Sequence, residues 1–279
     1  MSKILLINDM PGYGKVAFSA MIPVLSHMGY ELFNLPTAVV SNTLDYGKFD
    51  ILETTDYMKR TIGIWDELGF DFDAVSTGFI VSEEQARIIA EFCQKKAESG
   101  TLIFTDPIMG DEGQLYNGVT EDTVSHMRNL ISVSDCCVPN YTEAVCLSGA
   151  EYRADGASEE ELRDVIDRLL ELGAHSVVIT SCQVAGEQGK CVMGYDHKGK
   201  QYFKIGFQEI PIRFPGTGDI FSAVLLGRVL GGSGLCESTK AAMDTVSEMI
   251  RCNADNADKY KGIPLESCLD LIERGGNGR

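Results

Sequence analysis

Apolar and polar positions follow two periods along the chain, and segments of the two kinds alternate from the N-terminus onward. Short apolar runs such as Lys3–Ile7 and Leu102–Thr105 are typical of buried strands, whereas Thr54–Leu68 repeats its apolar positions at helical spacing. Strands that alternate with helices of this length indicate βαβ units, and therefore a mainly parallel sheet with helices on both faces. No linker or repeat interrupts the pattern, so we expect one domain over residues 1–279, frayed at 275–279.

Local signals mark where several elements begin, turn or break. Ser82-Glu-Glu-Gln85 and Ser158-Glu-Glu-Glu161 are capping-box patterns that predict helix starts. Asp196-His-Lys-Gly199 lies between two apolar runs and predicts a hairpin. Pro36 is expected to break the extended stretch Leu32–Val40. After the hairpin, we expect helices to the end of the chain.

A glycine-rich turn followed by a helix is the stretch on which the functional argument depends. Gly216 and Gly218 mark the turn, and the apolar residues of Ile220–Leu230 recur at helical spacing. Thr217 and the two glycines therefore lie at a helix N-terminus, whose free N–H groups and partial positive charge suit phosphate. Asp219 lies in the first turn. It either complements the helix dipole or acts as a carboxylate base beside an anion hole.

The residues directly after the first strand form a second candidate site, because parallel sheets bind ligands at the carboxyl ends of their strands. Asp9 lies at this strand tip, where a carboxylate could hold a substrate hydroxyl or amine. Gly12, Gly14 and Ala17 match the dinucleotide pattern G-x-G-x-x-A. A proline before them, and the lack of an acid at the end of the second strand, argue against a dinucleotide. A tight strand-to-helix turn is the alternative.

Carboxylates also follow two later strands. Asp106 and Asp111 flank a proline and glycine turn, and could hold Mg²⁺ directly or through water, or could simply form the turn. Asn140 is expected to cap the next helix, with Glu143 in its first turn. Glu143 could also join the water shell of the metal.

The joint placement of these groups indicates a reaction type. One edge of the sheet is expected to gather an anion hole, a candidate base, three further acids and, after Ser176–Thr180, the small residues Ser181 and Cys182, which could meet a nucleotide phosphate. That set suits transfer of a γ-phosphoryl group, in which backbone N–H groups and Mg²⁺ stabilise charge and an aspartate accepts the hydroxyl proton.

Composition excludes several other classes of protein. The formal net charge of −17 disfavours nucleic acid and anionic membranes as partners. No apolar run is long enough to span a membrane, and the N-terminal apolar run is too short for a signal peptide. The nine cysteines include no C-x-x-C pair, which favours buried free thiols in a reducing cytoplasm and disfavours zinc.

These residues resemble the ribokinase-like small-molecule kinases and, within them, the pyridoxal kinases. Gly216-Thr217-Gly218-Asp219 matches the most specific motif of that superfamily. Further similar motifs run in the same order over nearly the whole chain: Ser41-Asn42 with Tyr46-Gly47, Thr77-Gly78-Phe79, Asp106-Pro-Ile-Met-Gly-Asp111, Gly113-Gln-Leu-Tyr116, Pro139-Asn-Tyr-Thr-Glu143 and Val178-Ile-Thr-Ser181.

The resemblance implies ATP-dependent phosphorylation of the 5′-hydroxyl of pyridoxal, pyridoxine or pyridoxamine. It also implies a three-layer α/β/α fold without a large lid, Mg²⁺ with ATP, a monovalent cation such as K⁺, and a homodimer. The implied site residues are Asp219 as base, Gly216, Thr217 and Gly218 at the anion hole, Asp106, Asp111, Asn140 and Glu143 around Mg²⁺-ATP, Thr180 and Ser181 by the phosphates, Asp9, Ser41 and Asn42 at the substrate, and Tyr116 in a covering loop, residues 110–118.

The chain departs from the family pattern at the substrate end. Asp9 stands where the family has serine, Ala17 where it has glycine, and Thr43 where it has histidine. An acid at Asp9 could favour a cationic substrate such as pyridoxamine. Two alternatives stay open: a hydroxymethylpyrimidine kinase or another kinase of this fold, and a non-catalytic protein that binds a vitamer.

Overall fold

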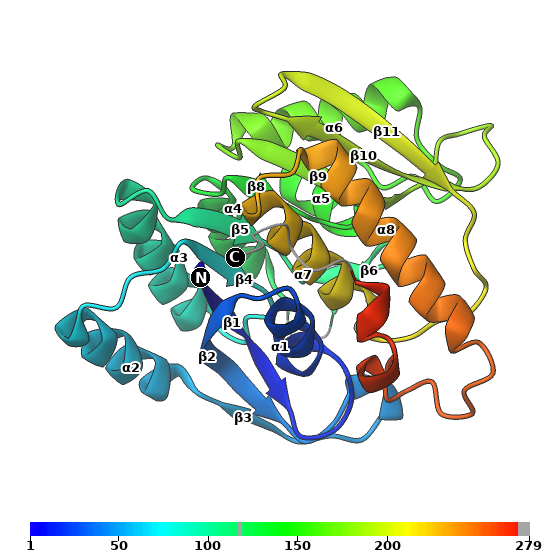
Figure 1. Ribbon diagram of the computed structural model, residues 1–279. Coiled ribbons are helices and arrows are strands. Elements are labelled where there is room, and N and C mark those ends of the chain that lie inside the picture. The colour runs from blue at the N-terminus through cyan, green and yellow to red at the C-terminus, as the bar shows by residue number, and fades with distance from the viewer. Residues whose placement is uncertain (117–118, 273–279) are drawn as a thin grey trace. The chain divides into compact units, whose positions relative to one another are not determined.

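The computed structural model describes residues 1–116 and 119–272 (Figure 1). Its contacts divide the chain into two compact units. The first contains Met1–Val81 and the chain from Ile210 onward, and the second contains Ser82–Glu209. A single domain over residues 1–279 stays a prediction, and the fraying predicted at 275–279 lies outside the described residues.

The first unit has a four-stranded sheet in the order β4-β1-β2-β3. Its strands are β1 (Lys3–Pro11), β2 (Glu31–Val40), β3 (Ile51–Glu53) and β4 (Ala74–Thr77). β1 pairs in parallel with both β2 and β4, while β3 adds an antiparallel strand to β2. Ile4 to Ile7 are fully buried, as expected for a central parallel strand that is covered on both faces.

The helices of the first unit come from both ends of the chain. They are α1 (Ala17–His27), α2 (Thr55–Leu68), α7 (Thr217–Leu230) and α8 (Leu235–Cys252), with the short 3-10 helices η1 (Leu44–Tyr46), η2 (Leu265–Ser267) and η3 (Leu269–Leu271). α1 packs on β1 and on α7, and α7 packs on α8 (Figure 1). This packing brings the glycine-rich turn before α7 to the carboxyl end of β1, although about 200 residues separate them in the sequence.

The second unit has the strand order β11-β10-β9-β8-β5. Its strands are β5 (Leu102–Thr105), β8 (Cys136–Cys137), β9 (Ser176–Cys182), β10 (Lys190–Asp196) and β11 (Gln201–Phe207), and its helices are α3 (Glu83–Glu98), α4 (Glu121–Ile131), α5 (Tyr141–Ser148) and α6 (Glu159–Glu171). β5, β8 and β9 are parallel, and β10 and β11 form the predicted antiparallel hairpin. The predicted α/β fold with a mainly parallel sheet is confirmed.

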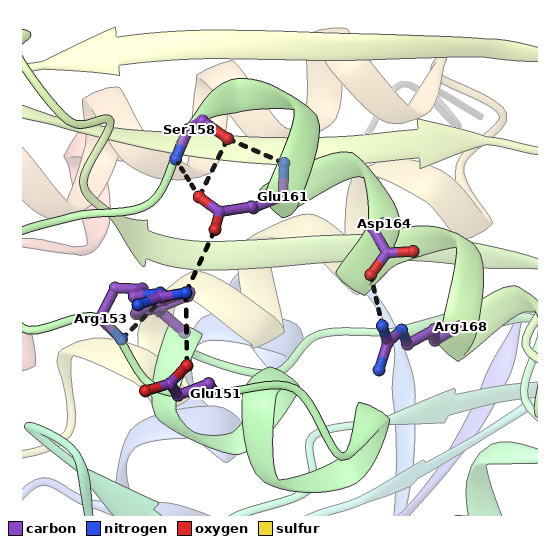
Figure 2. A network of polar contacts seen from close by, with 7 residues as sticks. Glu151, Arg153, Ser158, Glu161, Asp164 and Arg168 are labelled. Atoms are coloured by element: carbon purple, nitrogen blue, oxygen red, sulfur yellow. Dashed lines mark hydrogen bonds and ion pairs between the residues drawn. The ribbon is translucent and has the colours of Figure 1, made fainter.

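The predicted helix starts are confirmed by their side-chain contacts. Ser82 accepts a hydrogen bond from the N–H of Gln85 at 3.4 Å. Ser158 accepts one from the N–H of Glu161 at 3.2 Å, and Glu161 accepts the N–H of Ser158 at 2.8 Å (Figure 2). Arg153 lies between Glu161 and Glu151, at 3.6 and 3.3 Å. Exposed pairs of this kind contribute little energy, so they mainly orient the loop before α6.

Three element predictions are wrong. Pro36 does not break β2. The antiparallel partner β3 pairs with β2 only from Ala38 onward, so no described strand lies beside Pro36 on the β3 side and no N–H is needed there. The loop predicted at Gly110–Gly118 contains a hairpin of β6 (Gly110–Asp111) and β7 (Gln114–Leu115). α8 ends at Cys252 and is followed by short 3-10 turns, since Asn253 takes a non-helical conformation there.

None of the described helices is both long and apolar enough to span a membrane.

Candidate active site

Two glycines at the N-terminus of α7 have different surroundings: Gly216 is tightly packed, whereas Gly218 faces open space. Gly216 has φ +83°, and a Cβ atom on it would lie 2.0 Å from the carbonyl oxygen of Lys15. Only glycine fits this position. A Cβ on Gly218 would meet no heavy atom within 4 Å, and no side chain caps the helix. The first N–H groups of α7 therefore keep their capacity to bind an anion.

Asp219 lies in the first turn of α7 and is partly buried. Burial raises its pKa to about 6, while hydrogen bonds from the backbone of Ala17 and the side chain of Asn8 act in the other direction. Among the described residues, no ion pair involves Asp219. The Asp219 carboxylate at the helix N-terminus therefore has a raised proton affinity and is not neutralised by a structural ion pair.

Asn8, which the sequence did not single out, positions this carboxylate. It is 2% exposed in the second half of β1, and its Oδ1 accepts the N–H groups of Asp9 and Phe79 at 3.0 and 2.9 Å. With its oxygen occupied in this way, its amide group donates to Asp219. Gly78 is required beside it, because a Cβ there would lie 2.5 Å from the amide nitrogen of Asn8.

Asp9 lies within β1, which extends to Pro11 and does not end before Asp9 as predicted, and its pKa is affected by the charge of Asp219. It is 9% exposed, and its pKa is raised to about 7, first by burial and then by the negative charge of Asp219. The structure thus brings together two of the predicted site residues. A buried acid whose proton affinity is raised further by a neighbouring carboxylate is suited to holding a proton, a hydroxyl group or a cation.

Ser41 and Asn42 stabilise a turn. Ser41 Oγ accepts the N–H of Asp50 at 2.9 Å and donates to Asn42 Oδ1 at 2.8 Å. Asn42 Nδ2 donates to the carbonyl oxygen of Lys48 at 3.0 Å. A Cβ on Gly12 would lie 2.8 Å from the carbonyl of Ser41, so this turn lies directly against the loop after β1. Their contact with a substrate stays a prediction.

In the second unit, Asn140 and Glu143 form the predicted cap of α5. Asn140 Oδ1 accepts the N–H of Glu143 at 3.0 Å, and Glu143 Oε2 accepts the N–H of Asn140 at 2.8 Å. Glu143 Oε1 also accepts the N–H groups of Met109 and Gly110, at 2.9 and 3.5 Å. Burial and the charge of Asp106 raise the pKa of Glu143, and these hydrogen bonds act against the rise.

The same helix end anchors the β6–β7 hairpin. Asn140 Nδ2 donates to the carbonyl of Gly110 at 2.7 Å, and Thr142 Oγ1 accepts the N–H of Gly113 at 2.9 Å. Asp111 Oδ1 accepts the N–H of Glu112 at 2.9 Å, so this aspartate does form the turn. Tyr116 is 43% exposed after the hairpin, and residues 117–118 of the predicted covering loop lie outside the described residues.

The acids of the second unit fit a magnesium ion only in part. Both oxygens of Glu143 already accept N–H groups, so Glu143 is not placed for direct coordination. Asp106 and Asp111 are partly exposed carboxylates, and Mg²⁺ typically takes one or two carboxylates and completes its shell with water and phosphate. Over residues 1–116 and 119–272, no group of three or more His, Cys, Asp or Glu side chains could hold a metal ion by itself.

Thr180 and Ser181 lie at the end of β9. Thr180 donates its N–H to the carbonyl of Pro139 at 3.0 Å and forms a parallel bridge with Asn140. Ser181 is exposed and has φ +58°, a left-handed conformation that is uncommon outside glycine. The second unit therefore brings together Thr180, Asn140 and, through the anchored hairpin, Asp111.

Comparisons with known proteins agree with this fold. The family model described as phosphomethylpyrimidine kinase matches residues 24–264. A crystal structure from Bacteroides thetaiotaomicron with pyridoxal, provisionally described as a phosphomethylpyrimidine kinase, has a TM-score of 0.91 and 35% identity. The similarity covers 98% of this chain and 96% of that one.

Two pyridoxal kinases are also similar. The crystal structure of pyridoxal kinase from Lactobacillus plantarum has a TM-score of 0.86 and 28% identity, over 98% of this chain and 96% of that one. Pyridoxal kinase of Arabidopsis thaliana is 28% identical over 279 residues, which cover 96% of this chain and 88% of the relative.

Proposed function

Because this chain belongs to the phosphomethylpyrimidine kinase family, we propose that it transfers the γ-phosphoryl group of ATP to the 5′-hydroxyl of a vitamin B6 vitamer: pyridoxal, pyridoxine or pyridoxamine. One observation carries the proposal. Asp219 lies at the open N-terminus of α7, oriented by Asn8 and Ala17, with its pKa raised to about 6. The similarity to a relative bound to pyridoxal supports the substrate class.

Asp219 acts as the general base in this proposal. With a pKa of about 6, it is ionised at neutral pH and still basic enough to accept the proton of a hydroxyl group. The free N–H groups from Gly216 to Gly218 stabilise the negative charge that develops on the phosphoryl group. Asp9, beside Asp219, binds the acceptor, together with Ser41 and Asn42.

The second unit serves the nucleotide. Thr180 and Ser181 are assigned to its phosphates, and Asp106 and Asp111 would hold Mg²⁺, which neutralises phosphate charge when bound. Asn140 and Glu143 act by anchoring the hairpin that carries Asp111. A monovalent cation such as K⁺, a homodimer and a cytoplasmic location complete the proposal.

A panel of acceptors tests the reaction. The protein is assayed with Mg-ATP and pyridoxal, pyridoxine, pyridoxamine or hydroxymethylpyrimidine, with ADP release and the mass of the product as readouts. We expect a phosphorylated vitamer. Turnover of hydroxymethylpyrimidine alone would assign the second candidate, which the family description favours. Vitamer binding by calorimetry without any turnover would instead identify a non-catalytic binding protein.

The anion hole has its own test. Gly218→Ala places a methyl group in open space at the helix tip, where a phosphoryl group would approach. The variant should keep or raise the melting temperature, because alanine favours helix by up to about 1 kcal/mol, yet lose activity. Gly63→Ala is the matched control, since Gly63 also lies in a helix with nothing within 4 Å. If Gly218→Ala is as active as the Gly63→Ala control, the N–H groups at this helix end do not bind the phosphoryl group and the anion hole is removed from the proposal.

A further inference from the structure

Two cysteines lie directly opposite each other on β9 and β10. Cys182 and Cys191 are register partners in this antiparallel pair. Directly opposed residues have Cα atoms about 4.5–5.5 Å apart. That separation falls inside the range of about 4.4–6.8 Å in which a disulfide can form without backbone movement. Both residues are free thiols, 0% and 3% exposed.

The two sulfur atoms differ in how readily they lose a proton. Their interaction with each other lowers the pKa of Cys191 and raises the pKa of Cys182, whose Sγ donates to the carbonyl oxygen of Ile179 at 3.5 Å. Lys204 also favours the Cys191 thiolate, although Glu187 and Glu159, which bind Lys204, oppose it. Cys191 therefore has more thiolate character than an ordinary buried cysteine.

Two other buried thiols have raised pKa values. Burial raises the pKa of Cys93 and of Cys136 to about 12, which keeps them protonated and unreactive.

A cavity gives access to the pair. Cys191 lines a cavity of about 340 Å³, together with Val184, Gln188, Gly189 and Phe207. A cavity of this size has ample room for a molecule as small as hydrogen peroxide. A small oxidant in this cavity can react with Cys191. Cys182 is fully buried, so we expect it to be oxidised only by reaction with the oxidised Cys191.

We propose that Cys182 and Cys191 form a dithiol modification site that hydrogen peroxide converts to a cross-strand disulfide. The Cys191 thiolate attacks one peroxide oxygen, the O–O bond breaks, and the leaving hydroxide takes up the thiol proton as water. The Cys182 sulfur then attacks the resulting sulfenic acid, an S–S bond forms, and the hydroxyl leaves as a second water. Two thiols and one peroxide give one disulfide and two waters.

The disulfide would tie the end of β9 to β10. Cys182 directly follows Ser181, whose backbone is left-handed, and Thr180, which bridges to Asn140. Oxidation therefore restricts the strand end assigned to the nucleotide phosphates. This consequence rests on the proposed function, and we expect a higher KM for ATP that a reducing agent restores. Formation of the disulfide does not depend on the proposed function.

Peptide mapping of the full chain tests the site directly. Trypsin cuts after Arg168, Lys190 and Lys198, so Cys182 and Cys191 fall on separate peptides, residues 169–190 and 191–198, with one cysteine each. After treatment with hydrogen peroxide and blocking of the remaining thiols, we expect these two peptides to be linked, with the loss of two hydrogen atoms. Reduction should release both peptides.

Variants separate this site from general oxidation. The exposed Cys252 is replaced in all samples by Cys252→Ser, which removes links between molecules. Cys191→Ser should abolish the linked species and leave Cys182 reduced, whereas Cys182→Ser should trap a sulfenic acid on Cys191 that dimedone labels. If the native pair gives no linked peptide while Cys191 is overoxidised, or if Cys93 reacts as fast as Cys191, the proposal is overturned. Mapping of the native sequence decides the matter even where a variant fails to fold.

Discussion

The buried acids of the two units share a raised pKa but differ in their surroundings. In the second unit, Glu143 accepts backbone N–H groups from Met109, Gly110 and Asn140, which oppose the effect of burial. In the first unit, Asp9 is raised both by burial and by the like charge of Asp219, with its own backbone N–H acting in the other direction.

This difference separates a structural acid from one that is available to a ligand. Glu143 has its hydrogen-bonding capacity used by the protein, so removing its charge should damage the fold. Asp9 has a charge that the protein leaves largely uncompensated, so removing it should stabilise the fold and damage function. A raised pKa alone does not distinguish the two roles, whereas the hydrogen-bond partners do.

The largest effect is expected at Asp219. Asp219→Asn keeps the size of the side chain but cannot accept a proton, and kcat should fall by roughly 10²–10⁴-fold, the usual contribution of a general base. In the native protein, kcat/KM should rise with pH through about 6 and then level, because the ionised form is required. The measurement is a pH profile of steady-state turnover for both proteins.

Two results would contradict this role for Asp219. Normal turnover in Asp219→Asn would remove the base assignment. An unchanged rise through pH 6 in the residual activity of the variant would assign that titration to another group. Nucleotide binding by calorimetry serves as the control, because Asp219→Asn should still bind ATP.

The second prediction concerns the stability of the first unit. The pKa of Asp9 is raised from 3.8 to about 7, so the folded state binds a proton more tightly than the unfolded state. The native protein therefore loses stability as pH rises from about 4 to 7. At about 1.4 kcal/mol per pKa unit, the shift corresponds to an upper bound on the order of 4 kcal/mol.

Asp9→Asn should remove the loss of stability that ionisation of the buried Asp9 causes. We expect the variant to be more stable than the native protein at pH 8, by about 2–4 kcal/mol, and to show no gain at pH 4, where Asp9 is protonated in the folded state. Urea unfolding at both pH values measures the difference. A destabilised variant at pH 8 would mean that Asp9 has the same structural role as Glu143. Assay of the variant with the three vitamers also shows whether Asp9 favours the cationic pyridoxamine.

The third prediction is the opposite effect at Glu143. In Glu143→Gln, one oxygen becomes an NH₂ group, which must face a backbone N–H of either Asn140 or the Met109–Gly110 turn. The loss of such an acceptor should destabilise the protein by about 1–3 kcal/mol, and it should loosen the hairpin. Amide hydrogen exchange of Met109 and Gly110 gives a local readout.

Glu161→Gln is the matched control for Glu143. Glu161 caps α6 through the same reciprocal contact with Ser158 but lies at the surface, with half of its side chain exposed. Water can replace its lost contact, so we expect a change of less than about 1 kcal/mol. If the two variants lose the same amount of unfolding free energy, the hydrogen bonds from Met109 and Gly110 to Glu143 do not contribute to stability.

The sequence was sufficient wherever the decisive contact is local. Asn140 and Glu143 are three residues apart, and Gly216 to Asp219 are contiguous, so capping and turn patterns located both. The same holds for the hairpin after Asp196.

Contacts between distant residues could not be predicted in this way. Glu143 reaches Met109 across 34 residues, and Asn8 accepts the N–H of Phe79 across 71. Neither pairing leaves a periodic signal, so the anchoring role of Glu143 and the positioning role of Asn8 appear only in the structure. Pro36 was misjudged for the same reason, since its effect depends on where β3 begins.

The smallest expected effect lies at Ala17, where the backbone itself has an unfavourable conformation. Ala17 has φ +47° at the start of α1, and it donates its N–H to Asp219 from this conformation. A left-handed conformation costs an L-residue about 1–2 kcal/mol, which glycine avoids, while glycine adds about 0.5–1 kcal/mol of entropy to the unfolded chain. The methyl group of Ala17 is also buried, and its loss costs about 0.8 kcal/mol, so Ala17→Gly should leave the free energy of unfolding nearly unchanged, within about 0.5 kcal/mol, in urea unfolding. Ala241→Gly, at an ordinary position in α8, should destabilise it by about 1 kcal/mol. If both variants are destabilised equally, Ala17 stores no strain, and the N–H that holds Asp219 is oriented without energetic cost.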